Sequence, residues 1–145
     1  MFQRILVVCT GNICRSPVAQ AMLQQRLPNL TIESAGLGAL VGQPVDQQAR
    51  RLAEADGLDV ASHRARQLDA DQLAAADLVL VMSSGQRQVV ARRWPEALGK
   101  TLLLGKWLSK TQEIEIPDPY RKSPEVFEHV HRLLKEATGL WADRL

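Results

Sequence analysis

The 145-residue chain is poor in the residues that mark disulfide-rich, metal-bound and collagen-like proteins. Its two cysteines, Cys9 and Cys14, are too few for a disulfide framework, and no second Cys/His cluster completes a structural metal site. Nine glycines and seven prolines are far fewer than a low-complexity sequence contains. We therefore expect an ordinary folded protein without a structural metal.

Neither sign of charge dominates, and no long hydrophobic run is present. Eighteen Lys+Arg against sixteen Asp+Glu give a net charge of +2, which predicts no nucleic-acid partner. The chain lacks a signal-peptide pattern and a run of 18 apolar residues, so we expect a cytoplasmic protein without membrane insertion, whose thiols stay reduced. Hydrophobic residues make up 46% of the chain, enough for the core of one domain spanning residues 1–145.

Short apolar runs alternate with segments of helical periodicity. The predicted strands are 4–9, 30–34, 77–82 and 101–104. The predicted helices are 17–27, 47–56, 69–75, 86–94 and 124–141, and the stretch 105–122 is irregular. Ser16, Asp46 and Ser123 are the expected N-caps. This order predicts a single-domain α/β fold with an open parallel sheet and helices on both faces.

Ligands bind to such sheets where the carboxyl ends of strands meet helix N-termini, which places the loop 9–16 at the expected site. The loop reads Cys9-Thr-Gly-Asn-Ile-Cys-Arg15-Ser16. Its amides can converge on an anion, the helix directs its positive end there, and Arg15 matches two oxygens of a phosphoryl group. Gly11 and Asn12 tolerate the positive φ angles of a tight loop.

These surroundings, together with a hydrogen bond from the Ser16 hydroxyl, favour the thiolate form of Cys9. A thiolate beneath a bound phosphoryl group is a nucleophile directed at phosphorus. The residues alone therefore predict a phosphate-binding loop, between the first strand and the first helix, with cysteine chemistry at its base.

The segment Val8-Cys9-Thr-Gly-Asn-Ile-Cys-Arg-Ser-Pro17 resembles the signature of the low-molecular-weight protein tyrosine phosphatases. The resemblance continues through Glu33-Ser-Ala-Gly36 and Ser62-His63 to Asp118-Pro-Tyr120. It implies a four-stranded parallel sheet and hydrolysis of phosphotyrosine and small aryl phosphates through a cysteinyl-phosphate intermediate. It also implies that no metal or other cofactor takes part.

The resemblance assigns a role to each matching residue. Cys9 is the expected nucleophile, Arg15 the phosphate-binding cation, and Asp118, between two prolines, the general acid and later the base. Contacts to phosphate or substrate are expected from Thr10, Gly11, Asn12, Ile13, Cys14, Ser16, Leu40 and Tyr120, and support of the loop from Ser34 and His63. Cys14 is also the expected redox partner of Cys9, trapping an oxidised nucleophile as a disulfide, although packing beneath the loop would equally account for it.

Several positions depart from common members of the family. Gln20 and Ser83 stand where acidic residues are frequent, which removes expected carboxylate partners of Arg15. Leu40 and Arg121 resemble the bacterial branch that serves exopolysaccharide production. The resemblance therefore implies an autophosphorylated tyrosine kinase as substrate and partner, and a monomer or a weakly self-associating protein. Arg121 either meets acidic groups near the substrate or is an exposed arginine without such a role.

Two other functions use the same loop. Thioredoxin-coupled arsenate reductases relay a disulfide through two further cysteines, and residues 15–145 contain none. A non-catalytic phosphate- or phosphopeptide-binding module would keep the loop without needing both Cys9 and Asp118. Hydrolysis of p-nitrophenyl phosphate distinguishes the enzyme from the module.

Overall fold

Four short strands form one parallel sheet in the order β2-β1-β3-β4 within residues 2–145, the part of the chain that the computed structural model describes. The strands are β1 (Arg4–Cys9), β2 (Thr31–Gly36), β3 (Leu78–Val81) and β4 (Thr101–Leu103). The α-helices are α1 (Ser16–Arg26), α2 (Gln47–Ala55), α3 (Ala70–Ala75), α4 (Ser84–Arg93) and α5 (Pro124–Ala142). Two 3₁₀ turns, η1 (Pro95–Lys100) and η2 (Leu104–Trp107), flank β4.

The central strand β1 divides the core into two layers. Its apolar side chains alternate, so that Ile5 and Val7 join one buried cluster while Leu6 and Val8 join the other. A strand buried on both faces reads as a continuous apolar run, which is why the sequence predicted it. Cys9 ends the strand on the same face as Ile5 and Val7.

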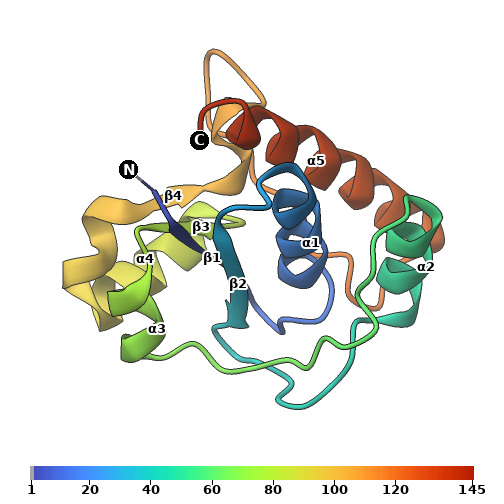
Figure 1. Ribbon diagram of the computed structural model, residues 1–145, viewed down its shortest axis with the longest axis horizontal. Coiled ribbons are helices and arrows are strands. Elements are labelled where there is room, and N and C mark those ends of the chain that lie inside the picture. The colour runs from blue at the N-terminus through green and yellow to red at the C-terminus, as the bar shows by residue number, and fades with distance from the viewer. Residues whose placement is uncertain (1) are drawn as a thin grey trace.

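Helices cover both faces of the sheet, as predicted (Figure 1). α1, α2 and α5 supply apolar side chains to the cluster on one face, where α1 packs between β2 and α5. α3 and α4 cover the other face. The α/β class, the parallel pairing and the four strands are all confirmed. Within residues 2–145, none of the helices combines the length and the apolar character needed to span a bilayer.

The predicted cap of the first helix is wrong. α1 includes Ser16, its N-cap position is Arg15, and no side chain caps it. The Ser16 hydroxyl instead lies 2.9 Å from Cys9 Sγ and accepts a hydrogen bond from Asn12 Nδ2. The caps predicted for the other two helices are confirmed, because Asp46 accepts from Gln48 N and Ser123 from Val126 N.

Candidate active site

The loop 9–16 joins β1 to α1 and turns its carbonyl groups outward. Five consecutive carbonyls accept hydrogen bonds of 2.7–3.1 Å from the surrounding segments. The carbonyl groups accept as follows: Cys9 from Leu37 N, Thr10 from Gly38 N, Gly11 from Leu40 N, Asn12 from His63 Nε2, and Ile13 from Asp46 N. Of the two residues expected to allow a positive φ, Asn12 has φ 59°, whereas Gly11 does not use this freedom.

The N–H groups of the same loop remain available to a ligand. Those of residues 11–15 donate to no acceptor within residues 2–145. α1 begins at Ser16 and adds the positive end of its dipole. Arg15 Nε is also buried and donates to no acceptor in that part of the chain. Because buried donors without partners are rare, this concentration of them marks an anion-binding site.

These donors surround a pocket of about 130 Å³, here called the Cys9 pocket. It is lined by Cys9, Thr10, Gly11, Ile13, Cys14, Arg15, Gly38, Leu40, Asp118 and Tyr120. Cys9 is 2% exposed and Tyr120 is 37% exposed, so the pocket runs from a buried thiol to an exposed ring. All three predicted catalytic residues therefore meet at one pocket, although Asp118 lies 109 positions beyond Cys9 in the chain.

Hydrogen bonds define the direction in which the Ser16 hydroxyl points. Asn12 Oδ1 accepts from Arg66 N at 3.0 Å, which fixes the orientation of the amide. Asn12 Nδ2 then donates to Ser16 Oγ at 2.7 Å. Since Ser16 Oγ already accepts this bond, its own hydrogen is free to point at Cys9 Sγ, 2.9 Å away. A hydroxyl donating to sulfur favours the thiolate form.

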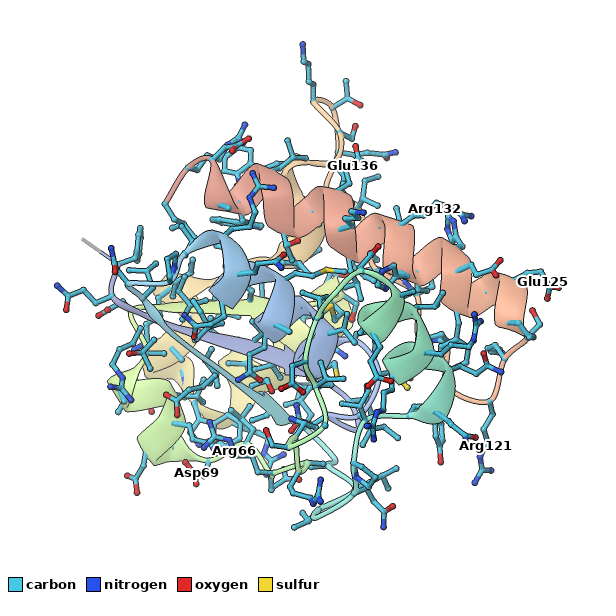
Figure 2. The ribbon with its side chains drawn as sticks, turned by 45° about the vertical axis from the view of Figure 1, so that its right-hand side comes forward. Arg66, Asp69, Arg121, Glu125, Arg132 and Glu136 are labelled. Carbon is cyan, nitrogen blue, oxygen red and sulfur yellow. The ribbon has the colours of Figure 1, made fainter. Side chains whose placement is uncertain are left out.

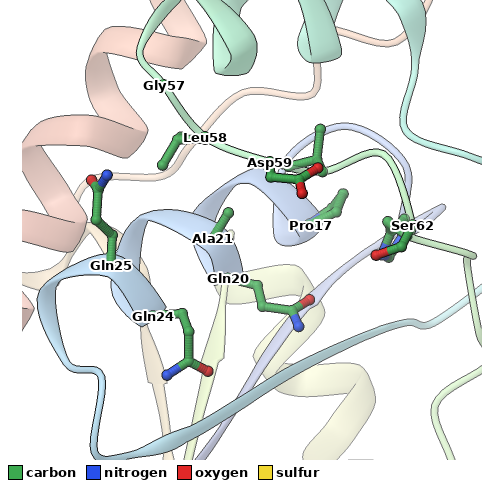
Figure 3. A pocket seen from close by; sticks show the side chains of 11 residues that line it. Pro17, Gln20, Ala21, Gln24, Gln25, Gly57, Leu58, Asp59 and Ser62 are labelled. Carbon is green, nitrogen blue, oxygen red and sulfur yellow. The ribbon is translucent and has the colours of Figure 1, made fainter.

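The same amide ties the loop to β2 and α1. Asn12 Nδ2 also donates to Ser34 Oγ at 3.0 Å, and the Ser34 hydroxyl donates to Gln20 Oε1 at 2.6 Å. Gln20 Nε2 donates to the carbonyl of Ile32. The expected effect of Gln20 on Arg15 is therefore wrong, because Gln20 belongs to the network around Ser34. Behind this network, α1 and residues 57–63 enclose a groove of about 360 Å³ that Gln20 lines (Figure 3).

His63 supports the loop from outside. Its Nε2 lies 2.7 Å from the carbonyl oxygen of Asn12. Burial, opposed by this hydrogen bond and reinforced by Arg64 and Arg66, lowers the pKa of His63 below its ordinary value of 6.5. The imidazole is thus neutral at neutral pH, and Nε2 carries the hydrogen because a carbonyl can only accept.

Arg15 is held from three directions. Its Nη1 donates to the carbonyl of Ile116 at 2.8 Å, and its Nη2 lies 3.4 Å from Thr10 Oγ1 and 3.6 Å from Asp118 Oδ2. Gln86, buried in α4, donates to the same Thr10 hydroxyl and accepts from Met82 N. Ser83 does not contact Arg15; it caps α4 by accepting from Gln86 N. Arg15 is thus oriented by a backbone carbonyl, a hydroxyl and the Asp118 carboxylate, without acidic residues at positions 20 and 83.

Asp118 lies at the rim, with 46% of its side chain exposed. Its Oδ1 accepts from Tyr120 N at 3.1 Å, which holds the carboxyl and the aromatic ring in one turn. Arg121 follows at φ 61°, and its guanidinium carbon lies 5.2 Å from the centre of the Tyr120 ring. Figure 2 shows Arg121 at the surface, in the turn before α5.

Cys14 lines the inner side of the Cys9 pocket and packs toward Val18 and Phe127. It is buried, and both cysteines are free thiols. Burial, reinforced by the charges of Asp46, Cys9 and Asp118, raises the pKa of the Cys14 thiol far above its ordinary value. Cys14 is therefore protonated at neutral pH.

Two residues at this site were missed by sequence reasoning. Arg66 donates its backbone N–H to Asn12 and its Nε to the carbonyl of Ser34. Gln86 orients Thr10 from the far side of the sheet. Neither has a local signal, since both act across contacts that only the fold creates. No cluster of three or more His, Cys, Asp or Glu side chains suited to a metal ion occurs among residues 2–145.

The fold and the loop together define a parallel α/β protein with an anion site above a buried cysteine. The family model for low molecular weight phosphotyrosine protein phosphatase matches residues 4–145. The low molecular weight protein-tyrosine-phosphatase Etp of Escherichia coli strain K12 is 46% identical over 144 residues, which are 99% of this chain and 95% of that protein.

Solved structures agree with this match. The structure of Vibrio vulnificus Wzb in complex with benzylphosphonate is 43% identical, covers 100% of both chains and has a TM-score of 0.95. The tyrosine phosphatase Wzb from Escherichia coli K30, in complex with sulphate, is 46% identical over 99% of both chains, also with a TM-score of 0.95. The chain therefore belongs to the low molecular weight phosphotyrosine protein phosphatase family, a class of phosphoric monoester hydrolases, as the sequence predicted.

Proposed function

We propose that the chain hydrolyses phosphotyrosine in proteins, and small aryl phosphates, by transferring the phosphoryl group to Cys9. The observation that carries this proposal is the buried, unpartnered Nε of Arg15 beside a buried thiol, among loop N–H groups that have no acceptor within residues 2–145. These donors match the equatorial oxygens of a phosphoryl group. The chain's similarity to Wzb structures holding benzylphosphonate and sulphate supports an anion at this place.

In the proposed first step, the Cys9 thiolate attacks phosphorus and the bond to the tyrosyl oxygen breaks. Asp118 gives a proton to the leaving oxygen, so that tyrosine departs neutral. In the second step water attacks the phosphocysteine, Asp118 takes the proton, and the Cys9 thiolate is restored. Arg15 and the loop N–H groups hold the transferred oxygens throughout, and the exposed Asp118 carboxyl exchanges protons with solvent between turnovers.

The shape of the Cys9 pocket supports an aryl phosphate as substrate. Ile13, Leu40 and Tyr120 provide apolar walls above the buried thiol. A flat ring is long enough to carry its phosphate to a nucleophile that is 2% exposed, and it packs well against apolar walls. The roles proposed for Thr10, Gly11 and Cys14 are contacts to the phosphoryl group through the loop backbone.

We also propose that the natural substrate is an autophosphorylated tyrosine kinase of bacterial exopolysaccharide production. Similarity to Etp and Wzb over nearly the whole chain supports this branch of the family. A cytoplasmic site of reaction fits the chemistry, because the nucleophile must remain a reduced thiol.

Cys14 is proposed as a guard of the nucleophile. Peroxide would oxidise Cys9 to a sulfenic acid, which would condense with the Cys14 thiol to a disulfide and release water. The high pKa of Cys14 makes its thiolate scarce, which would slow this condensation. A dithiol would then reduce the disulfide and restore the enzyme.

The first prediction concerns hydrolysis of p-nitrophenyl phosphate in the presence of EDTA. Cys9→Ser should abolish turnover, and Asp118→Ala should lower kcat by about 10²–10⁴-fold, the usual contribution of a general acid. Asp71→Ala, at an exposed position in the first turn of α3, is the matched control and should retain wild-type activity. Vanadate binding without any wild-type turnover would favour the binding module, and activity in Cys9→Ser would exclude the proposed nucleophile.

A further inference from the structure

The Thr10 side chain connects the Cys9 pocket to α4. Thr10 follows the cysteine in the loop, is exposed, and lines the Cys9 pocket. Its hydroxyl oxygen contacts two buried side chains, Gln86 from α4 and Arg15 from the loop itself. These two contacts determine which hydrogen bond the hydroxyl can still make to a ligand.

The carboxamide of Gln86 has only one possible orientation. Met82 N lies 2.7 Å from Gln86 Oε1, and a backbone N–H can only donate. The carboxamide oxygen must therefore face Met82, which turns Nε2 toward Thr10 Oγ1 at 3.2 Å. Since the carboxamide nitrogen donates and does not accept, Gln86 donates to Thr10 and cannot accept from it.

Arg15 takes the second acceptor position of the same hydroxyl. Its Nη2 lies 3.4 Å from Thr10 Oγ1, and a guanidinium only donates. A hydroxyl has two lone pairs and one hydrogen. Because Gln86 and Arg15 engage both lone pairs, the hydrogen of Thr10 must point away from both side chains. No acceptor within residues 2–145 bonds to it, so it is directed to the exposed side, where Thr10 lines the pocket.

A phosphoryl oxygen is the acceptor that suits this hydrogen. Cys9 Sγ already faces the Ser16 hydroxyl, 2.9 Å away. Arg15 Nε is buried and has no acceptor within residues 2–145. An anion that binds Arg15 in the pocket would lie beside Thr10, because the same guanidinium contacts the Thr10 hydroxyl. A hydrogen bond to such a charged acceptor is stronger than one to a neutral group.

We propose that the Thr10 hydroxyl donates a hydrogen bond to the phosphoryl group in the Cys9 pocket, and that Gln86 is the positioning residue that directs this hydrogen. The inference rests on the proposed function of the pocket. It adds a side chain of the loop and a residue of α4 to the loop N–H groups and Arg15. Gln86 has no contact with substrate and acts only through the polarity of its bond to Thr10.

Thr10→Val tests the donor, because valine keeps the branched shape of threonine without the hydroxyl. The dissociation constant of inorganic phosphate, measured by NMR titration, should rise about tenfold, as expected for a lost hydrogen bond to a charged group. The value of kcat/KM for p-nitrophenyl phosphate should fall by a similar factor. Thr10→Ser keeps the hydroxyl and should restore both values. Thr31→Val, at an exposed position where β2 begins, is the matched control and should bind phosphate as wild type does.

Gln86→Glu tests the direction of the hydrogen. An ionised carboxylate has nearly the size of a carboxamide but only accepts, so Thr10 would have to donate to it and turn a lone pair toward the pocket. Phosphate binding should then weaken through the added negative charge and through the reversed hydroxyl. Only the second effect needs Thr10, so Gln86→Glu should raise the phosphate dissociation constant about tenfold more with Thr10 present than in the Thr10→Val background. Equal effects in both backgrounds would overturn the positioning role of Gln86.

The outcomes separate this inference from the proposed function. Unchanged phosphate binding in Thr10→Val, with turnover by wild type intact, would overturn the hydroxyl donor and leave the phosphatase. Weaker binding in both Thr10→Val and Thr10→Ser, with a lower temperature of unfolding, would show that Thr10 only shapes the loop and would overturn the donor as well. A wild type that binds phosphate with the expected dependence on Thr10, but never hydrolyses p-nitrophenyl phosphate, would support the hydrogen bond and overturn the proposed hydrolysis.

Discussion

At the scale of the residue, Asn12 makes four hydrogen bonds that shape the loop. It is fully buried, its Oδ1 accepts from Arg66, its Nδ2 donates to Ser16 and Ser34, and its carbonyl accepts from His63. Asparagine tolerates the left-handed conformation at φ 59° better than most residues. One side chain therefore satisfies both the backbone geometry and the hydrogen bonds of the site.

The neutral state of His63 makes stability depend on pH. Burial lowers the pKa of His63 in the folded protein below its ordinary value of 6.5. As the pH falls through 6.5, the imidazole is therefore protonated in the unfolded chain before it is protonated in the folded protein. Because the unfolded chain then binds more protons than the folded protein, the free energy of unfolding decreases. His63→Gln should remove this part of the dependence. Urea unfolding at about pH 7.5 and about pH 5.5 measures it.

The matched control is His129→Gln, at an exposed position of α5. It should lose as much stability between the two pH values as wild type does, whereas His63→Gln should lose less. An equal loss in wild type and His63→Gln would show that His63 does not cause the acid sensitivity.

At the scale of the element, the end of β2 is pressed against the loop. A Cβ atom at Gly36 would lie 2.5 Å from the carbonyl oxygen of Thr10 and 3.1 Å from Asn12 Cβ. Gly36 N also donates to the carbonyl of Arg66, so the strand cannot move away without losing this bond. The backbone of β2 at Gly36 therefore packs directly against the backbone of the loop 9–16, and a side chain at this position would push the two apart.

Gly36→Ala should therefore destabilise the protein by about 1–3 kcal/mol, the usual cost of overpacking. It should also lower kcat, because the displaced loop carries the donors of the site. Gly99→Ala is the control, since a Cβ there would meet nothing within 4 Å. Thermal unfolding and p-nitrophenyl phosphate hydrolysis of the two variants test the prediction, and wild-type stability in Gly36→Ala would contradict it.

At the scale of the whole molecule, the chain that follows β4 closes one side of the site, on the same face of the sheet as Cys9. Ile116 N donates to the carbonyl of Met82 after β3, and the Ile116 carbonyl accepts from Arg15. α5 then packs across α1 and α2. Its Trp141 donates Nε1 to the carbonyl of Leu104 at 2.9 Å and meets the ring of Trp107 edge-on at 5.7 Å.

Trp141→Phe should lower the free energy of unfolding by about 1–3 kcal/mol, because it leaves the buried Leu104 carbonyl without its partner. Trp107→Phe should cost less, since the buried Trp107 Nε1 donates to no acceptor within residues 2–145. Urea denaturation of both variants gives the comparison. A larger loss in Trp107→Phe would show that ring packing, and not the hydrogen bond, determines the stability of this region.

Much of the fold was predictable because its signals are local. Apolar runs mark the strands, and Asp46 and Ser123 mark helix starts. The Ser16 cap was predicted wrongly because a serine hydroxyl at the start of a helix can either cap a backbone N–H or bond to other side chains. Here the Ser16 hydroxyl bonds to the neighbouring Asn12 and Cys9 side chains. The Gln20 interpretation failed for the same reason, since sequence position does not reveal which neighbour a side chain reaches.

The sequence by itself determined the order of strands and helices. It also placed Cys9, Arg15 and Ser16 within one continuous loop, and their spacing predicts phosphate binding above a cysteine. Only the tertiary structure decided what lies above and behind that loop. Asp118 reaches the Cys9 pocket and Gln86 reaches Thr10 because parallel strands bring the segments that follow them to one edge of the sheet. Arg66 reaches Asn12 because the segment between α2 and α3 pairs with the end of β2, through Gly36 and Gln67. Contacts between segments far apart in sequence depend on packing, which local patterns do not encode.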